Sequence, residues 1–241
     1  MIQAVLFDFN GVIIDDEPLQ LKAYQEVLGH EGLTVTEADY FGSLGMDDRT
    51  FVRAAYERAE RELTDEVLGR VIEAKTAAHR KLLEGELPLF PGVVTLIKAL
   101  KRQHSIGLVS MARRTEIDHV LERAALANYF DTVVSAEDTT ACKPDPSCYN
   151  NGLELLNRRR GEAHVIPLRP DECLVVEDSP PGVLSARAAG MRTLGVTNTV
   201  PDKALRDAGA DCVTRSLADW TPDAVHHVFD TNWGRGRKDE G

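Results

Sequence analysis

The stretch best suited to chemistry in this chain comes at its start, where an apolar run ends abruptly in a carboxylate. Residues Ile2 to Phe7 have the length and β-branched content of a buried parallel strand. Asp8 follows at once, and Asn10-Gly11 then breaks the strand, because both residues tolerate positive φ. An aspartate here could cap the next helix, or it could take part in chemistry at the end of the strand.

Other polar residues follow later apolar runs in the same way. They are Ser110 after residues 106–109, Lys143 in a proline-stiffened loop after residues 132–134, and Glu177 with Asp178 after residues 174–176. Each one alone has a structural explanation, as a helix cap, an exposed cation or a pair of loop acids. In an open α/β sheet, however, ligands bind just beyond the carboxyl ends of the strands, so we expect these residues to meet at one edge.

The chemistry that such residues could share is phosphoryl transfer. A carboxylate such as Asp8 can act as a nucleophile and form an aspartyl-phosphate. The oxygens of Asp8, Glu177 and Asp178 are hard ligands that suit Mg²⁺. Lys143 could neutralise charge on the transferring oxygens, and the Ser110 hydroxyl could donate a hydrogen bond to one of them.

The elements that position these residues alternate between strands and helices from Pro88 onward. The predicted strands cover residues 106–109, 132–134, 174–176, 192–196 and 212–214, and the predicted helices cover 92–101, 114–125, 146–156, 181–189 and 203–208. This alternation predicts an α/β fold with a doubly wound parallel sheet and right-handed crossovers. Between residues 16 and 86 the pattern is helical only, with helices over 17–29, 51–61 and 64–83, so we expect a helical insertion.

Composition limits the class of protein and its partners. The chain has 241 residues, a net charge of −11 and a pI near 5.1, which argues against nucleic acid as the main partner. Four cysteines without metal-ligand spacing are typical of a reduced cytosolic protein. With neither a signal-like N-terminus nor a membrane-length apolar run, we expect a cytoplasmic protein without membrane contact, as a monomer or weak dimer.

Taken together, the motifs resemble the haloacid dehalogenase superfamily, in its β-phosphoglucomutase-like group. The matching segments are Leu6 to Ile13, Gly107 to Ser110, Lys143 to Pro146 and Val175 to Val183. The resemblance implies a Rossmann-like core of residues 1–15 and 87–231. It also implies a mobile helical cap of residues 16–86 that closes over the substrate, and residues 232–241 look like a disordered tail.

The resemblance also implies roles for the site residues. Asp8 would be the nucleophile, and Mg²⁺ would be bound by Asp8, the main-chain carbonyl of Asn10 and Asp178. Glu177 would be a direct or indirect partner of the metal, and the phosphate-binding roles map onto Ser110 and Lys143.

Position 10 departs from the family pattern. Phosphatases and mutases of the family usually carry an aspartate there, which protonates the leaving oxygen and then deprotonates the attacking group, whereas this chain has Asn10. An amide cannot exchange a proton near neutral pH, so general acid–base catalysis, worth about 10²–10⁴-fold, should be lost while the metal site survives. Gln20 stands where related enzymes often have a histidine, so both proton-handling positions hold amides.

Four interpretations of Asn10 stay open at this point. The protein could be a slow phosphatase for esters with good leaving groups, or another group such as Asp16 or a cap residue could supply the proton. It could instead bind phosphate and metal without turnover. Finally, the asparagine could be an engineered replacement of aspartate that traps an intermediate.

Residues of the inserted block should select the substrate. Arg49 could hold an anionic or polyhydroxylated group, or pair with a neighbouring aspartate, and Arg113 could contact a phosphate or the cap. Lys75 is a candidate for the Schiff-base lysine of phosphonate-cleaving relatives, but an exposed helix lysine is the favoured interpretation. The dehalogenase branch uses no Mg²⁺ and would leave the Glu177-Asp178 pair without a role.

The sequence therefore predicts a Mg²⁺-dependent phosphohydrolase that acts on a small phosphorylated metabolite through phospho-Asp8. A sugar phosphomutase is the alternative among enzymes, although it needs a second phosphate-binding group that the sequence does not reveal. A non-catalytic protein that binds phosphate and metal is the alternative outside enzymes.

Overall fold

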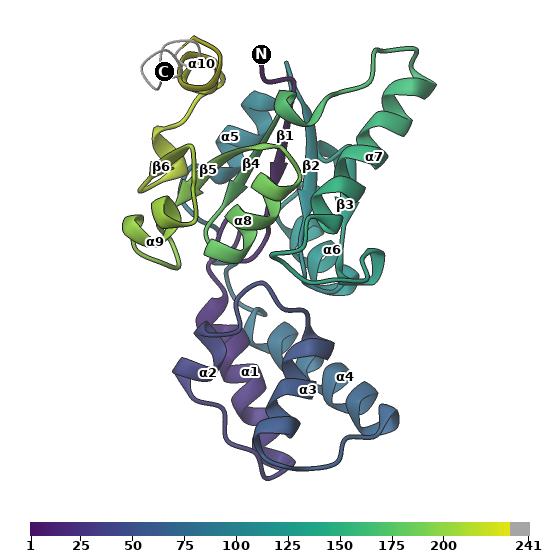
Figure 1. Ribbon diagram of the computed structural model, residues 1–241. Helices are drawn as coiled ribbons and strands as arrows, with labels where there is room; N and C mark the ends of the chain where they lie inside the picture. The colour runs from purple at the N-terminus through teal and green to yellow at the C-terminus, as the bar shows by residue number, and fades with distance from the viewer. Residues whose placement is uncertain (232–241) are drawn as a thin grey trace.

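A computed structural model describes residues 1–231, and its centre is a six-stranded parallel sheet in the order β3-β2-β1-β4-β5-β6 (Figure 1). The strands are β1 (Ala4–Phe7), β2 (Ser105–Val109), β3 (Thr132–Val134), β4 (Cys173–Glu177), β5 (Arg192–Val196) and β6 (Cys212–Thr214). The strand order reverses direction beside β1, so the carboxyl ends of β1, β2 and β4 meet at the edge where ligands bind in such sheets. The predicted parallel α/β sheet is confirmed.

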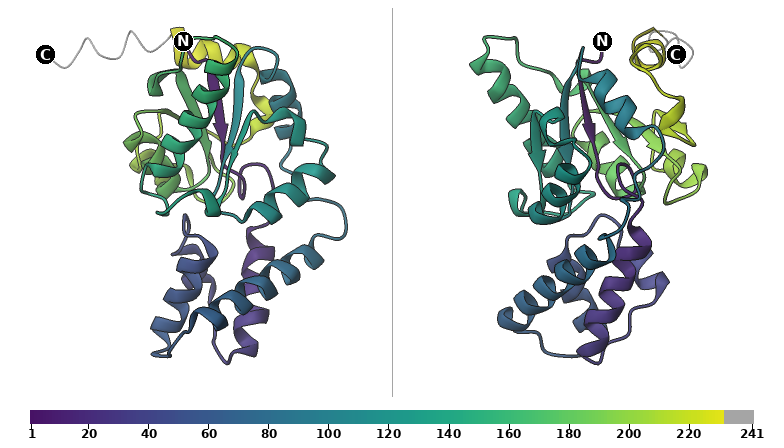
Figure 2. Two further views of the ribbon diagram at one scale, coloured as in Figure 1. Left: turned by 90° about the vertical axis from the view of Figure 1, so that its right-hand side faces the viewer. Right: turned by 180° about the vertical axis from the view of Figure 1, so that it is seen from behind.

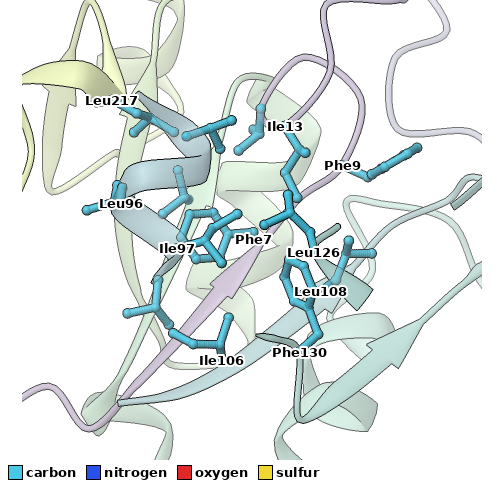
Figure 3. Close-up of a cluster of buried hydrophobic side chains, with 14 of the residues drawn as sticks. Phe7, Phe9, Ile13, Leu96, Ile97, Ile106, Leu108, Leu126, Phe130 and Leu217 are labelled. Atoms are coloured by element: carbon cyan, nitrogen blue, oxygen red, sulfur yellow. The ribbon is translucent and has the colours of Figure 1, made fainter. Parts of the chain in front are cut away.

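Helices cover both faces of the sheet. They are α5 (Val93–Leu100), α6 (Arg114–Arg123), α7 (Ser147–Glu162), α8 (Pro180–Ala188), α9 (Asp202–Asp207) and α10 (Pro222–His226). Side chains of one face, such as Phe7 and Leu108, pack with α5 and α6 in a cluster that Figure 3 shows in close-up. Leu6 and Val175 point to the other face and pack against α7 and α8. Alternate residues of β1 thus enter different cores, as the period of a strand requires.

The block between β1 and α5 forms a separate helical lobe, which we define as α1 (Glu17–His30), α2 (Glu37–Phe41), α3 (Asp48–Arg58) and α4 (Asp65–Leu82). This lobe lies beyond the carboxyl ends of the strands, at the end of the molecule opposite the N-terminus and α10 (Figures 1 and 2). It has its own hydrophobic cluster, which includes Tyr24, Phe51 and Leu68. The assignment of residues 16–86 to a cap domain stays a prediction, and the predicted tail of residues 232–241 lies outside the described residues.

Two neighbouring chain segments join the lobe to the sheet. Ile14 and Leu89 form an antiparallel bridge. The Asp15 amide donates to the Pro88 carbonyl at 2.7 Å, and the Phe90 amide donates to the Ile13 carbonyl at 3.1 Å. Backbone hydrogen bonds therefore hold the segment that enters the lobe next to the segment that leaves it.

The observed elements differ from the predicted ones mainly in the lobe and at helix ends. The helix predicted over residues 51–61 begins at Asp48, because Asp47 accepts a hydrogen bond from the Thr50 amide and caps it. The five-residue helix α2 was not predicted, and α7 continues to Glu162 beyond the predicted end at residue 156. Among residues 1–231, no helix combines the length and apolarity needed to cross a membrane.

Candidate active site

The pocket lies between the carboxyl edge of the sheet and the helical lobe. On the sheet side it is lined by Asp8, Asn10, Ser110, Lys143 and Asp178. On the other side it is lined mostly by residues of the lobe, together with Glu116 of α6. The principal ones are Glu17, Gln20, Tyr24, Tyr40, Asp48, Phe51 and Lys75. The structure thus brings the residues predicted at separate strand ends into one site.

Asp8 and Lys143 form a buried pair at the bottom of this pocket. The Lys143 Nζ donates to Asp8 Oδ1 at 2.7 Å and to Glu177 Oε1 at 2.6 Å. Burial works against the charged form of Lys143, but the two carboxylates outweigh it and raise the pKa of the lysine. Burial raises the pKa of Asp8 to about 7, and Lys143 opposes this shift. The lysine therefore stays charged and favours the ionised form of Asp8.

Glu177 is fixed by several hydrogen bonds at once. Besides Lys143, the Tyr149 hydroxyl donates to Oε1 at 2.6 Å, and the Ser179 hydroxyl donates to Oε2 at 3.1 Å. The absence of a side chain at Gly182 makes room for this carboxylate, because a Cβ there would lie 1.9 Å from Glu177 Cδ. Glu177 is thus held beside Lys143, and its charge also helps to raise the pKa of Asp8.

Three carboxylates form a candidate metal centre. One oxygen each from Asp8, Glu177 and Asp178 lies within 4.8 Å of the others. Asp178 Oδ2 is buried and has no hydrogen-bond partner among residues 1–231. Burial, with the nearby charges of Glu177 and Asp8, raises the pKa of Asp178 well above its usual value. A buried carboxylate oxygen without a donor, beside two further acids, fits a hard divalent cation such as Mg²⁺.

Gly11 allows the chain to approach this centre closely. Its φ of 74° lies in the left-handed region, and a Cβ there would lie 1.9 Å from Asp178 Oδ2. Gly11 thus reverses the chain and also lets the backbone pass close to Asp178, since only glycine fits both the conformation and the space.

Ser110 lies directly after β2 and is buried. Its hydroxyl oxygen accepts a hydrogen bond from the Ala112 amide at 3.0 Å, which orients the side chain at the start of the following turn. The hydroxyl hydrogen is not used in that bond, so Ser110 can donate it to an anion in the pocket.

Asn10 is tied to a fully buried carboxylate at the base of the lobe. Its Nδ2 donates to Asp16 Oδ1 and Oδ2 at 2.9 and 3.0 Å. Asp16 is 0% exposed, and it also contacts Gln20 Nε2 at 3.2 Å and His79 Nε2 at 2.9 Å. Asp16 is not among the residues that line the pocket, so it is poorly placed to supply a proton to a substrate directly.

Glu17 is a pocket carboxyl that the sequence did not single out. It accepts a hydrogen bond from the Tyr40 hydroxyl, and burial, with the neighbouring Asp16, raises its pKa to about 7. It lies in the first turn of α1, where acids are common because they interact favourably with the helix dipole. No local sequence signal distinguishes it from the acids that usually begin helices.

The favoured interpretation of Lys75 as an exposed helix lysine is wrong. It is 2% exposed, and its Nζ donates to Asp48 Oδ1 at 3.0 Å and to Glu116 Oε1 at 3.1 Å. Burial opposes its charge, but the two carboxylates raise its pKa above the usual value. A Schiff-base lysine needs a neutral amine, so this environment also argues against phosphonate cleavage through Lys75.

The two predicted substrate arginines do not line the pocket. Arg49 is exposed on α3, outside the pocket. Arg113 instead joins the core to the lobe, since it donates to Thr76 Oγ1 at 3.0 Å and to Glu73 Oε1 at 2.7 Å. Of the two uses expected for Arg113, contact with the helical block is the one present. Gln20 does line the pocket, as described above.

The sequence is similar to several characterised phosphatases. It is 32% identical to a phosphorylated carbohydrates phosphatase of Thermotoga maritima over 213 residues, covering 87% of this chain and 92% of the relative. It is 30% identical to the fructose-1-phosphate phosphatase YqaB of Escherichia coli, covering 80% and 95% of the two chains. Its fold matches a β-phosphoglucomutase of Clostridium difficile with a TM-score of 0.83 at 22% identity, covering 96% and 98%.

The match to a family model agrees with these similarities. The model of the haloacid dehalogenase-like hydrolases matches residues 2–190, which include all the strand-end residues described above. The resemblance noted in the sequence is therefore confirmed. This chain belongs to the haloacid dehalogenase-like hydrolase family, and the sequence relatives reported above are phosphatases.

Proposed function

We propose that this protein is a Mg²⁺-dependent phosphohydrolase that transfers a phosphoryl group from a small phosphorylated carbohydrate to Asp8 and then to water. The main support is the buried arrangement of Asp8 with Lys143 on one side and Asp178 on the other. The names of the similar phosphatases support a phosphorylated carbohydrate as the substrate.

In this proposal each residue has a distinct task. Asp8 attacks phosphorus with one carboxylate oxygen, and the bond to the leaving oxygen breaks as the new bond forms. Lys143 and the Ser110 hydroxyl stabilise charge on the transferring oxygens. Mg²⁺, when bound by Asp8, Asp178 and the Asn10 carbonyl, would supply further neutralisation of that charge. The helical lobe would act as a cap that excludes bulk water.

Proton transfer is the weak step of this site. The Asn10 amide cannot protonate the leaving oxygen, and its Nδ2 is occupied by Asp16. Glu17 is the best substitute, because it lines the same pocket and a carboxyl with a pKa near 7 can both give and take a proton at neutral pH. Esters with good leaving groups need little protonation and should react even without it.

A phosphomutase is less well supported by the pocket. That reaction needs a second cationic site for the phosphate that does not react. Among the described residues that line the pocket, the lysines are Lys75 and Lys143, and each already contacts two carboxylates. A mutase would have to displace one of these ion pairs.

The test is Mg²⁺-dependent release of p-nitrophenol from its phosphate ester and of phosphate from acetyl phosphate and fructose 1-phosphate. Asp8→Ala should abolish all three activities. Asn10→Asp should raise fructose 1-phosphate hydrolysis by up to about 10²–10⁴-fold, and by less the more Glu17 already supplies the proton; acetyl phosphate hydrolysis should rise far less, because the restored acid matters most for a poor leaving group. If the unmodified chain and Asn10→Asp are both silent on all three esters, the proposed hydrolase activity is wrong.

A further inference from the structure

The part of the pocket formed by the helical lobe and α6 contains polar groups that mostly accept hydrogen bonds. We call Gln20, Asp48, Lys75 and Glu116 the distal wall. All four residues line the pocket, and all are buried. Three come from the helical lobe, and Glu116 comes from α6 at the edge of the core.

The single cation of the distal wall is already neutralised. Lys75 contacts Asp48 at 3.0 Å and Glu116 at 3.1 Å, so the three groups together carry a formal charge of −1. Glu17 adds a further acid to the same pocket. The expected substrate arginines Arg49 and Arg113 do not line it. A second anionic group of a substrate would therefore meet carboxylates without a spare cation, which is electrostatically unfavourable.

Two buried acceptors of the distal wall lack donors. Asp48 Oδ2 and Gln20 Oε1 have no hydrogen-bond partner among residues 1–231. Asp48 is 8% exposed and uses only Oδ1, which contacts Lys75 and the Tyr24 hydroxyl. Gln20 is 5% exposed, and its Nε2 donates to Asp16. The side-chain oxygen Oε1 is therefore the atom of Gln20 that is left to accept a hydrogen bond from a ligand. Buried acceptors without donors are costly, so they indicate a ligand that donates hydrogens.

We propose that the distal wall selects an uncharged polyhydroxylated leaving group, such as a polyol or sugar, and rejects leaving groups that carry a carboxylate or a second phosphate. Hydroxyl groups of the substrate donate to Asp48 and Gln20, while Lys75 donates to a hydroxyl oxygen. Asp48 is the main specificity-determining residue. This inference rests on the proposed phosphohydrolase function and narrows its substrate class.

The distinction between neutral and anionic leaving groups matters because relatives of this chain differ in the leaving group of the substrate for which they are named. One similar protein is a hexitol phosphatase of Escherichia coli, at 28% identity, and another is a phosphoglycolate phosphatase of Yersinia pseudotuberculosis, also at 28% identity. Overall similarity therefore does not choose between a neutral and a carboxylate-bearing substrate. The charges and free acceptors of the distal wall do.

The experiment compares glucitol 6-phosphate, 2-phosphoglycolate and glucose 1,6-bisphosphate by kcat/KM, with acetyl phosphate as a reference that has few groups for the wall to contact. We expect glucitol 6-phosphate to exceed the two competitors, each of which carries a second anionic group, by at least about tenfold, since unpaired buried groups penalise the wrong substrate. Asp48→Asn removes one negative charge, so it should reduce the preference over 2-phosphoglycolate by at least about fivefold. Glu57→Gln, an equal charge change at an exposed position of the same helix, should leave the preference unchanged.

A binding measurement keeps the inference testable if turnover is slow or Asp48→Asn folds poorly. Thermal stabilisation of the unmodified protein by each phosphate ester, with and without Mg²⁺, should be larger for glucitol 6-phosphate than for 2-phosphoglycolate. Equal or stronger binding of 2-phosphoglycolate would overturn the distal-wall inference, even if the protein is a phosphatase. Absence of hydrolysis of every ester by both the unmodified chain and Asn10→Asp, together with selective binding of glucitol 6-phosphate, would refute the phosphohydrolase proposal and leave the wall's selectivity supported.

Discussion

Replacing Lys75 by methionine should destabilise the protein strongly, although the change alters no apolar packing group. Lys75 Nζ is buried between Asp48 of the lobe and Glu116 of the core, at 3.0 and 3.1 Å. Methionine has a side chain of nearly the same length and can occupy the same buried space, but it leaves two buried carboxylates without their cation. The substitution thus tests electrostatics rather than shape.

The magnitude follows from the cost of an uncompensated buried charge. Removing one partner of a buried pair costs about 3–5 kcal/mol. A chain of this size loses roughly 2–4 °C in Tm for each kcal/mol, so a fall of roughly 6–20 °C is expected. Because Asp48 and Glu116 belong to different parts of the molecule, opening of the lobe would hydrate both acids and reduce the cost. The expected result is therefore a lower Tm together with a more open lobe.

The assay combines thermal unfolding at pH 7 with limited proteolysis of the segments that join the lobe to the core. Lys81→Met provides the control, since Lys81 is an exposed residue of the same helix α4. That change should alter stability by less than about 0.5 kcal/mol. Lys75→Met should show both the lower Tm and faster cleavage near residues 14–17 and 83–89.

The combination of Lys75→Met with Asp48→Asn and Glu116→Gln distinguishes the proposed cause from a general packing defect. It removes the charges left behind, so most of the lost stability should return. If Lys75→Met unfolds at the same temperature as the unmodified chain, the buried ion pairs do not hold the lobe as described. If the triple variant is no more stable than Lys75→Met, packing rather than charge is responsible.

Further predictions concern the sheet side of the site. Without metal, the free energy of unfolding should fall as pH rises from about 4 toward 7, because burial raises the pKa of Asp8 to about 7 and the folded state therefore holds this proton more tightly than the unfolded chain does. Mg²⁺ should raise the Tm measured by calorimetry more at pH 8 than at pH 5. A larger rise in Tm at pH 5 than at pH 8 would contradict this prediction. Tyr149→Phe should cost about 1.5–3 kcal/mol in denaturant unfolding, because it removes a buried hydrogen bond to the Glu177 carboxylate; an unchanged unfolding midpoint would show that this bond contributes little. Gly182→Ala should lower both stability, by about 1–3 kcal/mol, and kcat, because its Cβ must displace that carboxylate, whereas Gly161→Ala in open space should be neutral or slightly stabilising.

The strand-end residues could be predicted because their signal is local. Asp8, Ser110 and Glu177 each follow a short apolar run, and the rule that parallel strands end at one edge was enough to bring them together. The residues that contact these side chains from distant parts of the sequence could not be predicted from the same local pattern. Tyr149 lies in the first turn of α7, 28 residues before Glu177, and nothing in its neighbourhood indicates that its hydroxyl will reach a carboxylate.

Gln20 of the distal wall was named from the sequence, but its charged part, Asp48 and Glu116 around a buried Lys75, was missed for a similar reason. Lys75 lies 27 residues from Asp48 and 41 residues from Glu116, and all three occur in helices where charged residues are normally exposed. Only the packing of the lobe against α6 buries them together. Arg49 is the opposite case: contact with the substrate and a surface position were both open from its sequence, and on α3 it is exposed and outside the pocket.

The backbone bridge at the base of the lobe has a consequence for how the chain folds. Ala4 of β1 pairs with Ser105 of β2, so the first strand must wait for a partner about a hundred residues away. The lobe, with its own hydrophobic cluster, can form before the sheet, and the Ile14–Leu89 bridge then brings its two ends together. The loop left to close between β1 and β2 becomes roughly fourfold shorter, which saves on the order of 1 kcal/mol of loop-closure entropy. The inserted lobe, which separates β1 and β2 in the sequence, would thus bring these two strands closer together and accelerate the assembly of the sheet.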